Sequence, residues 1–342
     1  MYSRARQNIR HEYFVKTPGC HQRATTILSP VKRLIFLLIT AIALLSCNQN
    51  HKHTVNQHLF GVEVEINLYT PDRDLANRAI EAVTHDLNLI DGFTDAIKAK
   101  PLSRVNSLLQ SGEWFSLNPS LYELIQLSHE YFQKTGGAFN PVVLGALRQA
   151  WGFYQQTPTP DLKIINHLLK QDLTMNDIEI KGIRVRGRKA ELKLDFDLLA
   201  VGYAIDNQLE HLGELGIRQA ALRIGPVTGT LGTVSQTFTI DNRHNIALKP
   251  GEAICRFSAR DSRFPKLGRL DPRSAWPVKP VPTIVVIHRS ARTASVACAA
   301  LSIASEDEWD SLVQNLGLTY VWWRRGDLEL ITAAMRSRLN GP

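Results

Sequence analysis

The spacing of apolar and polar residues predicts strands and helices in mixed order. Residues 62–68 alternate between the two types, which is typical of a half-buried strand, and Pro71 ends it. Apolar residues at helical spacing follow over 75–90, up to Gly92. Because strands and helices are interspersed rather than segregated, we expect an α+β protein.

Later segments continue this mixture. Asn118 and Pro119 form an N-cap and first-turn pair for a helix that should end at Gly136 and Gly137. The stretch 155–190 is rich in proline and charge, and is a candidate separation between two lobes of sheet and helix. The other expected elements are a helix over 195–215, strands over 219–224, 237–240 and 283–287, a closely packed helix over 294–304, and a hairpin with strands 320–323 and 328–331.

The front of the chain predicts an export signal. Lys32 and Arg33 precede the apolar run 34–45, and Ser46 and Cys47 follow it, which is the order of a secretory signal. The run is shorter than the roughly 20 residues of a membrane-spanning helix. Leu-Leu-Ser-Cys at 44–47 is similar to a bacterial lipobox, whose cysteine becomes lipid-modified and N-terminal. A buried hydrophobic helix is the alternative.

This interpretation divides the chain into a signal segment over 1–46, a tether over 47–58 and a folded domain over 59–340. The domain would be held by a lipid on Cys47 to a membrane of the bacterial cell envelope, facing the periplasm. Residues 1–30 are long and polar for a signal, so we expect translation to start near Val31, from a GTG codon.

Most of the net positive charge lies in the N-terminal segment. Residues 1–46 carry +6 of the formal net charge of +8, so the rest of the chain is nearly neutral. A nearly neutral body argues against nucleic-acid binding. Trp322 and Trp323 beside Arg324 could stack on bases, but we interpret them as core residues next to a solvated turn.

Two cysteines remain beyond the signal and the lipid site. Cys255 and Cys298 would lie in an oxidising compartment, where they could form a disulfide or stay as two buried thiols. Their spacing resembles no metal-binding motif. Both possibilities stay open, because a sequence cannot place two Cα atoms at bonding distance.

Five strings in register over 59–339 resemble the FAD:protein FMN transferases, the ApbE family. They are Gly-Ala-Phe-Asn-Pro at 137–141, Trp-Gly-Phe at 151–153, Leu-Asp at 194–195 continuing to Gly-Tyr-Ala-Ile-Asp at 202–206, Leu-Asp-Pro-Arg-Ser at 270–274, and Met-Arg-Ser-Arg-Leu at 335–339. The third string is similar to the family's L-D-x-G-x-x-A-K-G-Y-A-x-D, and the fourth to its H-I-x-D-P-R-T-G. The resemblance implies an ApbE-like (T-fold-like), two-lobed architecture.

The resemblance also implies an activity. Such enzymes bind FAD and Mg²⁺, cleave the pyrophosphate and esterify FMN onto a Thr or Ser hydroxyl of an acceptor flavoprotein. A lipid anchor would suit an acceptor that belongs to a membrane redox complex. The residues that match the family's flavin positions are Ala138, Phe139, Asn140, Asp195 and Val201.

Several matching positions have lost their charged or polar side chains. In the family's A-D-x-x-x-T-A-L helix, the Asp and Thr one turn apart both hold Mg²⁺, and here they are Ser295 and Ala299. Leu198 stands where a third oxygen donor or a backbone turn is expected, and Val201 stands at the Lys of K-G-Y. Pro226 removes an amide donor from a glycine-rich turn.

Some retained residues have a structural interpretation as well. Asp195 could cap the following helix instead of contacting flavin. Phe139 and Asn140 could form only a turn, and Asn106 could belong to a helix cap. No residue is assigned to catalysis. The competing function is therefore a non-catalytic lipoprotein that binds flavin or a flavoprotein and has lost the metal site, and a scaffold without a ligand is a third possibility.

Overall fold

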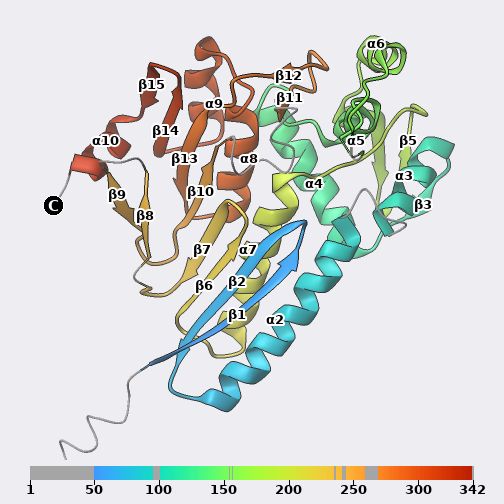
Figure 1. Ribbon diagram of the computed structural model, residues 1–342. Coiled ribbons are helices and arrows are strands. Elements are labelled where there is room, and N and C mark those ends of the chain that lie inside the picture. Colours follow the sequence, from blue (N-terminus) through green and yellow to red (C-terminus); the bar gives the residue numbers. More distant parts are fainter. Residues whose placement is uncertain are drawn as a thin grey trace, which may run out of the picture. The chain divides into compact units, whose positions relative to one another are not determined.

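The computed structural model describes residues 50–94, 101–153, 155, 157–234, 236–240, 244–258 and 269–340 (Figure 1). An eight-stranded sheet runs through the described part in the order β1-β2-β6-β7-β10-β13-β14-β15, and all neighbouring strands are antiparallel. The strands are β1 (His51–Leu59), β2 (Val62–Thr70), β6 (Ala220–Ile224), β7 (Val227–Leu231), β10 (Ala253–Phe257), β13 (Thr283–His288), β14 (Tyr320–Arg325) and β15 (Leu328–Ile331).

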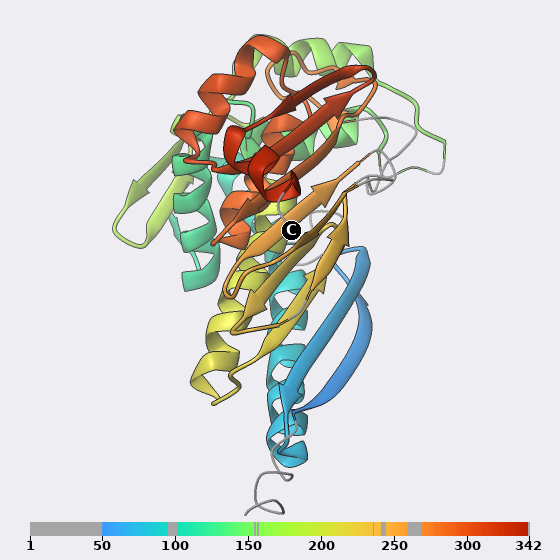
Figure 2. The same ribbon diagram turned by 90° about the vertical axis from the view of Figure 1, so that its left-hand side faces the viewer.

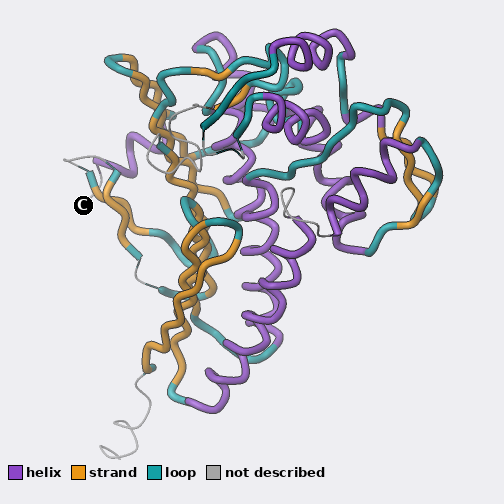
Figure 3. Tube along the Cα trace, turned by 45° about the vertical axis from the view of Figure 1, so that its right-hand side comes forward, coloured by secondary structure: helices purple, strands orange, loops and turns teal. Residues whose placement is uncertain are grey.

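Helices cover one face of this sheet (Figure 3). The apolar stripe of α2 shows why, since its buried residues recur at helical spacing and face the strands. Three helices pack on the strands, namely α2 (Arg73–Thr94), α7 (Leu198–Glu214) and α8 (Ala291–Leu301). Apart from α10 (Ala333–Asn340) on the opposite face, the other described helices are α3 (Pro101–Ser111), α4 (Pro119–Lys134), α5 (Pro141–Ala150), α6 (Leu162–Gln171), α9 (Trp309–Asn315) and the short 3₁₀ helices η1 (Met175–Asp177) and η2 (Glu306–Glu308).

A smaller apolar cluster forms on the opposite face of the sheet. Figure 2 shows the elements on that face, with α10 and the C-terminus in front. Here the hairpin of β8 (Thr237–Thr239) and β9 (Asn245–Ala247) and the helix α10 (Ala333–Asn340) pack on β10, β13 and β14. Trp322 belongs to this cluster and Trp323 to the main core, and each is 2% exposed. Both tryptophans are therefore core residues, as expected.

Most of the expected elements are confirmed. Residues 62–68 lie in β2, residues 75–90 lie in α2, and β14 and β15 form the expected hairpin. Asn118 caps α4, because its side-chain oxygen accepts a hydrogen bond from the Leu121 amide at 2.8 Å and Pro119 occupies the first turn. The α+β class is confirmed.

Two boundaries were wrong. Residues 51–58, assigned to the tether, form β1, because they pair along their whole length with β2. The stretch 155–190 is no separation between lobes, since it contains α6, η1 and a hairpin of β4 (Ile178–Lys181) and β5 (Arg184–Gly187). Residues Asn50–Pro342 form one unit. Two further small pairings involve β3 (Phe115–Ser116) with β5, and β11 (Arg269–Leu270) with β12 (Pro277–Val278).

The expected signal segment and Cys47 lie outside the described residues. Among the helices that are described, none combines the length and the apolar character needed to cross a membrane.

Cys255 and Cys298 form a disulfide in the structure. It joins β10 to α8, with the two Cα atoms 6.5 Å apart, and both residues are fully buried. The possibility left open by the sequence is thereby decided in favour of a bond. Because Cys298 directly precedes Ala299, the disulfide links the sheet to the C-terminal part of α8.

Candidate functional site

A pocket of about 260 Å³ lies between the turn joining β1 and β2, the start of α7 and the end of α8. Its walls also include the segment before α5 and the β6–β7 turn, where Pro226 stands. Seven of the eight residues singled out for flavin or metal contact line it: Ala138, Phe139, Asn140, Asp195, Leu198, Val201 and Ala299. The fold thus brings together positions that lie more than 150 residues apart in the chain.

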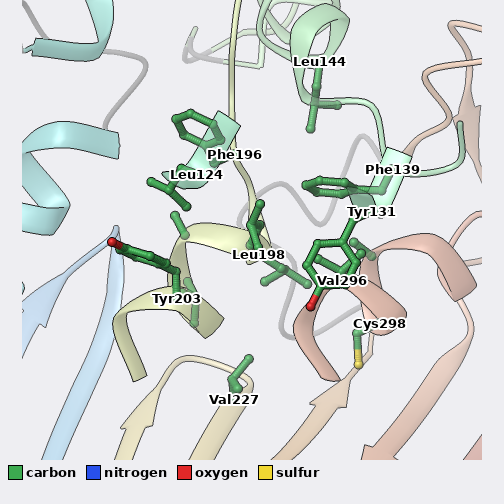
Figure 4. Packing of buried hydrophobic residues seen from close by; sticks show 14 of the residues in the cluster. Leu124, Tyr131, Phe139, Leu144, Phe196, Leu198, Tyr203, Val227, Val296 and Cys298 are labelled. Carbon is green, nitrogen blue, oxygen red and sulfur yellow. The ribbon is translucent and has the colours of Figure 1, made fainter. Parts of the chain in front are cut away.

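An aromatic wall bounds one side of the pocket. Phe139 is 3% exposed and meets Tyr131 edge-to-face, with ring centroids 6.5 Å apart. Figure 4 shows its ring between Leu144 and Tyr131, with Leu198 nearby. Phe60, from the β1–β2 turn, and Phe257, from β10, also contribute to the lining. Such a wall suits a planar, largely apolar ring system.

Asn140 and Asp195 have structural partners as well as pocket contacts. Asn140 precedes α5, but its side chain does not cap that helix; its amide donates to the Leu173 carbonyl at 2.8 Å. The Asp195 carboxylate accepts from the Asp197 amide at 3.0 Å, so it caps the turn before α7. The residue that precedes the first turn of α7 is Asp197, so Asp195 stabilises the turn before the helix rather than capping the helix itself, and it also lines the pocket. Its contact with flavin stays a prediction.

Asn106 is not a helix cap. It lies inside α3 and is 4% exposed, and its side chain clamps Leu194 by donating to that residue's carbonyl at 3.1 Å and accepting from its amide at 2.8 Å. Leu194 directly precedes Asp195. The clamp therefore fixes the backbone that presents the Asp195 carboxylate to the pocket.

Two arginines and two aspartates form a buried ion-pair cluster on the pocket wall. Arg148 binds the carboxylate of Asp195 at 2.5 Å and that of Asp197 at 2.7 Å. Arg269 contacts both carboxylate oxygens of Asp197. The four side chains are only 6–12% exposed, and all four residues line the pocket.

Asp197 is the centre of this cluster. Burial alone would raise the pKa of its carboxyl, but the guanidinium groups of Arg269 and Arg148 outweigh that effect and hold the pKa well below its usual value. The carboxylate is therefore charged at neutral pH. Its backbone has φ of +49°, a left-handed conformation that costs a side-chain-bearing residue free energy.

Comparison with known proteins decides the family. A model of the ApbE family matches residues 60–322. The chain belongs to the ApbE family. It is 26% identical over 300 residues to an FAD:protein FMN transferase of Rhodobacter capsulatus, an alignment that covers 82% of this chain and 57% of that protein. The chain thus spans a little over half the length of that curated relative.

Solved structures of ApbE proteins share the fold. The flavinyl transferase ApbE of Pseudomonas stutzeri, in its apo form, has a TM-score of 0.73 at 19% identity, covering 86% of this chain and 98% of that one. The ApbE protein of Thermotoga maritima has a TM-score of 0.75 at 19% identity, covering 85% and 100%. The flavin transferase ApbE of Vibrio cholerae has a TM-score of 0.73 at 17% identity, covering 85% and 100%.

Ser295 is the one residue singled out that does not line the pocket. It is fully buried where α8 touches α7, and its hydroxyl oxygen has no hydrogen-bond partner among the described residues. A Cβ on Gly202 would lie 2.6 Å from that oxygen and 2.5 Å from the Ala291 carbonyl. Gly202, from the string Gly-Tyr-Ala, is therefore required for the close approach of the two helices.

The residues present do not fit the Mg²⁺ ion that the ApbE resemblance implies. Ser295 points into a helix contact, and Ala299, which does face the pocket, has no side-chain oxygen. In the part of the chain that the structure describes, no three His, Cys, Asp or Glu side chains are grouped so as to hold a metal. Three aspartates line the pocket. Asp195 and Asp197 are engaged by arginines, and Asp91 accepts a hydrogen bond from the Phe60 amide at 2.8 Å.

The sequence interpretation missed Arg148, Asp197 and Arg269. A signal existed only for Asp197, which stands at the Gly of L-D-x-G-x-x-A-K-G-Y-A-x-D, where its positive φ explains the family's glycine. The two arginines reach Asp197 across 49 and 72 residues of chain. No local pattern marks contacts of that separation.

Restoring the two lost ligand types should fail to rebuild a metal site. In Ser295→Asp combined with Ala299→Thr, the new carboxylate enters a fully buried contact beside Gly202, so we expect a loss of about 2 kcal/mol in the free energy of unfolding and no gain in Mg²⁺ affinity. Urea unfolding and titration calorimetry with MgCl₂ would measure the two effects. Ala299→Thr alone is the control, because residue 299 faces the pocket. Tight Mg²⁺ binding by the double variant would show that α8 still faces a metal site.

Proposed function

We propose that this protein is a flavin transferase that moves FMN from FAD onto a Thr or Ser hydroxyl of an acceptor flavoprotein. The reaction breaks the pyrophosphate bond between the FMN and AMP parts of FAD. A new bond joins the acceptor oxygen to the FMN phosphorus, AMP leaves, and the hydroxyl proton passes to a base. Membership of the ApbE family and the similarity to the FAD:protein FMN transferase of Rhodobacter capsulatus support this proposal.

The observation that carries the proposal is the convergence of the family's flavin positions on one pocket. Ala138, Phe139, Asn140, Asp195 and Val201 come from two separate parts of the chain, and all five line it. The pocket combines an aromatic wall with buried charged groups, which suits a ligand with a planar ring and phosphates. We do not include magnesium, because residue 295 has a buried hydroxyl instead of a carboxylate and does not line the pocket, and residue 299 has no side-chain oxygen.

Covalent flavin transfer tests the proposal directly. The purified full-length chain would be incubated with FAD and an acceptor flavoprotein domain, with and without MgCl₂, and the acceptor examined for flavin fluorescence on a denaturing gel. We expect a fluorescent acceptor band and its loss in an acceptor whose target hydroxyl is replaced by Ala. FAD binding without a band would support the non-catalytic flavin-binding protein, and absence of both would support a scaffold.

We propose further that the protein is lipid-anchored through Cys47 in the bacterial cell envelope and serves a membrane redox complex on the periplasmic side. The support is the lipobox-like sequence at 44–47 and the charged and apolar segments before it. Mass spectrometry of the mature protein should find a diacylglyceryl group on residue 47, and Cys47→Ser should abolish it. A mature N-terminus elsewhere, without lipid, would contradict the anchor.

A further inference from the structure

Arg269 lies beside the helical turn where the family's metal-binding Thr would stand. Its Nε donates to the Ser302 hydroxyl at 3.2 Å, and that hydroxyl donates to the Ala299 carbonyl at 2.6 Å. Ala299, in the last turn of α8, and Ile303, just beyond that helix, line the pocket together with Arg269. The guanidinium group is thus tied to the part of α8 that has lost its metal ligand.

Asp197 and Phe257 fix the orientation of this guanidinium group. Asp197 holds it through both carboxylate oxygens, and the ring of Phe257 lies under it at 5.2 Å. A bidentate carboxylate and a stacked ring leave an arginine little rotational freedom. Arg269 is therefore a preorganised cation, and its side chain is only 12% exposed.

Arg269 has donors left over. A guanidinium group has five N–H donors, and the bonds to Asp197 and Ser302 use three of them among the described residues. The two remaining N–H groups belong to a nearly buried side chain on the pocket wall. A buried donor without an acceptor is unfavourable, so a ligand oxygen that accepted from it would be bound more tightly.

The charges of this cluster argue against a bound divalent cation and in favour of a phosphate ligand. Arg148 and Arg269 balance Asp195 and Asp197, so the cluster is neutral without an added cation. A divalent ion placed beside Asp197 would have to displace one of two guanidinium groups from a desolvated carboxylate, which is unfavourable. Fixed arginines bind phosphate oxygens through directed, charge-assisted hydrogen bonds.

We infer that Arg269, held by Asp197, binds the phosphate oxygens of the flavin nucleotide in place of a divalent cation, so that nucleotide binding in this pocket is independent of metal. This inference rests on the proposed function for the identity of the ligand. It assigns to Arg269 a contact with phosphate rather than with the flavin ring. Arg148 is a positioning residue, which holds Asp197 against Arg269.

Binding of three flavins to the full-length chain tests the inference. FAD, FMN and riboflavin share the ring, but riboflavin has no phosphate. We expect the Kd for FAD, measured by fluorescence quenching, to change less than about twofold between excess EDTA and excess MgCl₂. Arg269→Gln should weaken FAD and FMN by about tenfold or more, which corresponds to the loss of a charge-assisted hydrogen bond, and should leave riboflavin within about twofold.

Arg338→Gln is the matched control. Arg338 is equally buried at 11%, binds Glu252 through both carboxylate oxygens and lies over the Tyr320 ring, but it lies on the opposite face of the sheet, in α10. Its substitution should leave all three affinities unchanged. If Arg269→Gln does not fold, Arg269→Lys keeps the charge without the planar pair of donors, and should weaken FAD but not riboflavin.

The possible outcomes are distinct. FAD binding that EDTA abolishes, or equal weakening of FAD and riboflavin by Arg269→Gln, would overturn the inference while leaving the proposed function intact. No binding of any flavin, with or without metal, would overturn the proposed function and this inference together.

Discussion

Asp197→Asn should lower the free energy of unfolding by about 3–5 kcal/mol at neutral pH, because it removes the buried carboxylate that neutralises two guanidinium groups. The amide has nearly the same volume, so the loss reports charge rather than packing. Urea unfolding at pH 7, followed by circular dichroism, would measure it. Asp86→Asn is the control, since Asp86 is 34% exposed and pairs with His211, and it should cost less than about 1 kcal/mol.

The stability difference between the wild-type chain and Asp197→Asn should become smaller at low pH. The pKa of Asp197 is lowered in the folded protein by Arg269 and Arg148, against the effect of burial. Its contribution to stability is therefore complete above the unfolded pKa of about 3.9, and is lost as the pH falls toward the folded pKa. The difference between the wild-type chain and Asp197→Asn should be about 1 kcal/mol smaller at pH 3 than at pH 7. A difference that grew on acidification would contradict this account of the cluster.

Loss of the Cys255–Cys298 disulfide should cost about 4 kcal/mol in the free energy of unfolding. The bond closes a loop with a sequence separation of 43, and chain-entropy arguments give roughly this value for a loop of that length. Because both cysteines are fully buried, a reductant should act only on unfolded chains. Equilibrium urea unfolding with and without dithiothreitol is therefore the appropriate measurement.

The variant Cys255→Ala with Cys298→Ala separates the bond from its surroundings. It should be at least as destabilised as the reduced wild-type chain, with a further packing loss of about 1 kcal/mol from the two missing sulfur atoms, and dithiothreitol should not affect it. A wild-type chain whose urea midpoint is the same with and without reductant would contradict the disulfide.

Elements with strong local signals could be predicted from the sequence. The alternation in β2, the apolar stripe of α2 and the cap at Asn118 each need only neighbouring residues to be recognised. β1 was missed because its side chains are mostly polar. It is an edge strand, half exposed to solvent, and its pairing with β2 rather than its own apolar content makes it a strand.

The candidate site, too, was predictable from the sequence only in part. The family strings predicted five flavin positions that all line one pocket, because those strings shape the backbone around it, and flavin contact itself stays a prediction. They placed Ser295 at the site, but the α7–α8 contact at Gly202 turns that side chain away from the pocket. The Arg148–Asp197–Arg269 cluster depends on contacts between distant segments, and its charges balance only in three dimensions.

The composition of the pocket wall has a consequence for biosynthesis. Its residues extend from His58 in the first strand to Ile303, just beyond α8, so the wall cannot close until nearly the whole chain has been made. A nascent or truncated chain that ends before α8 therefore has no ligand site. Once the site exists, a bound ligand opposes every opening that disrupts this wall, so it should slow hydrogen exchange in elements from β1 to α8 rather than in one local segment.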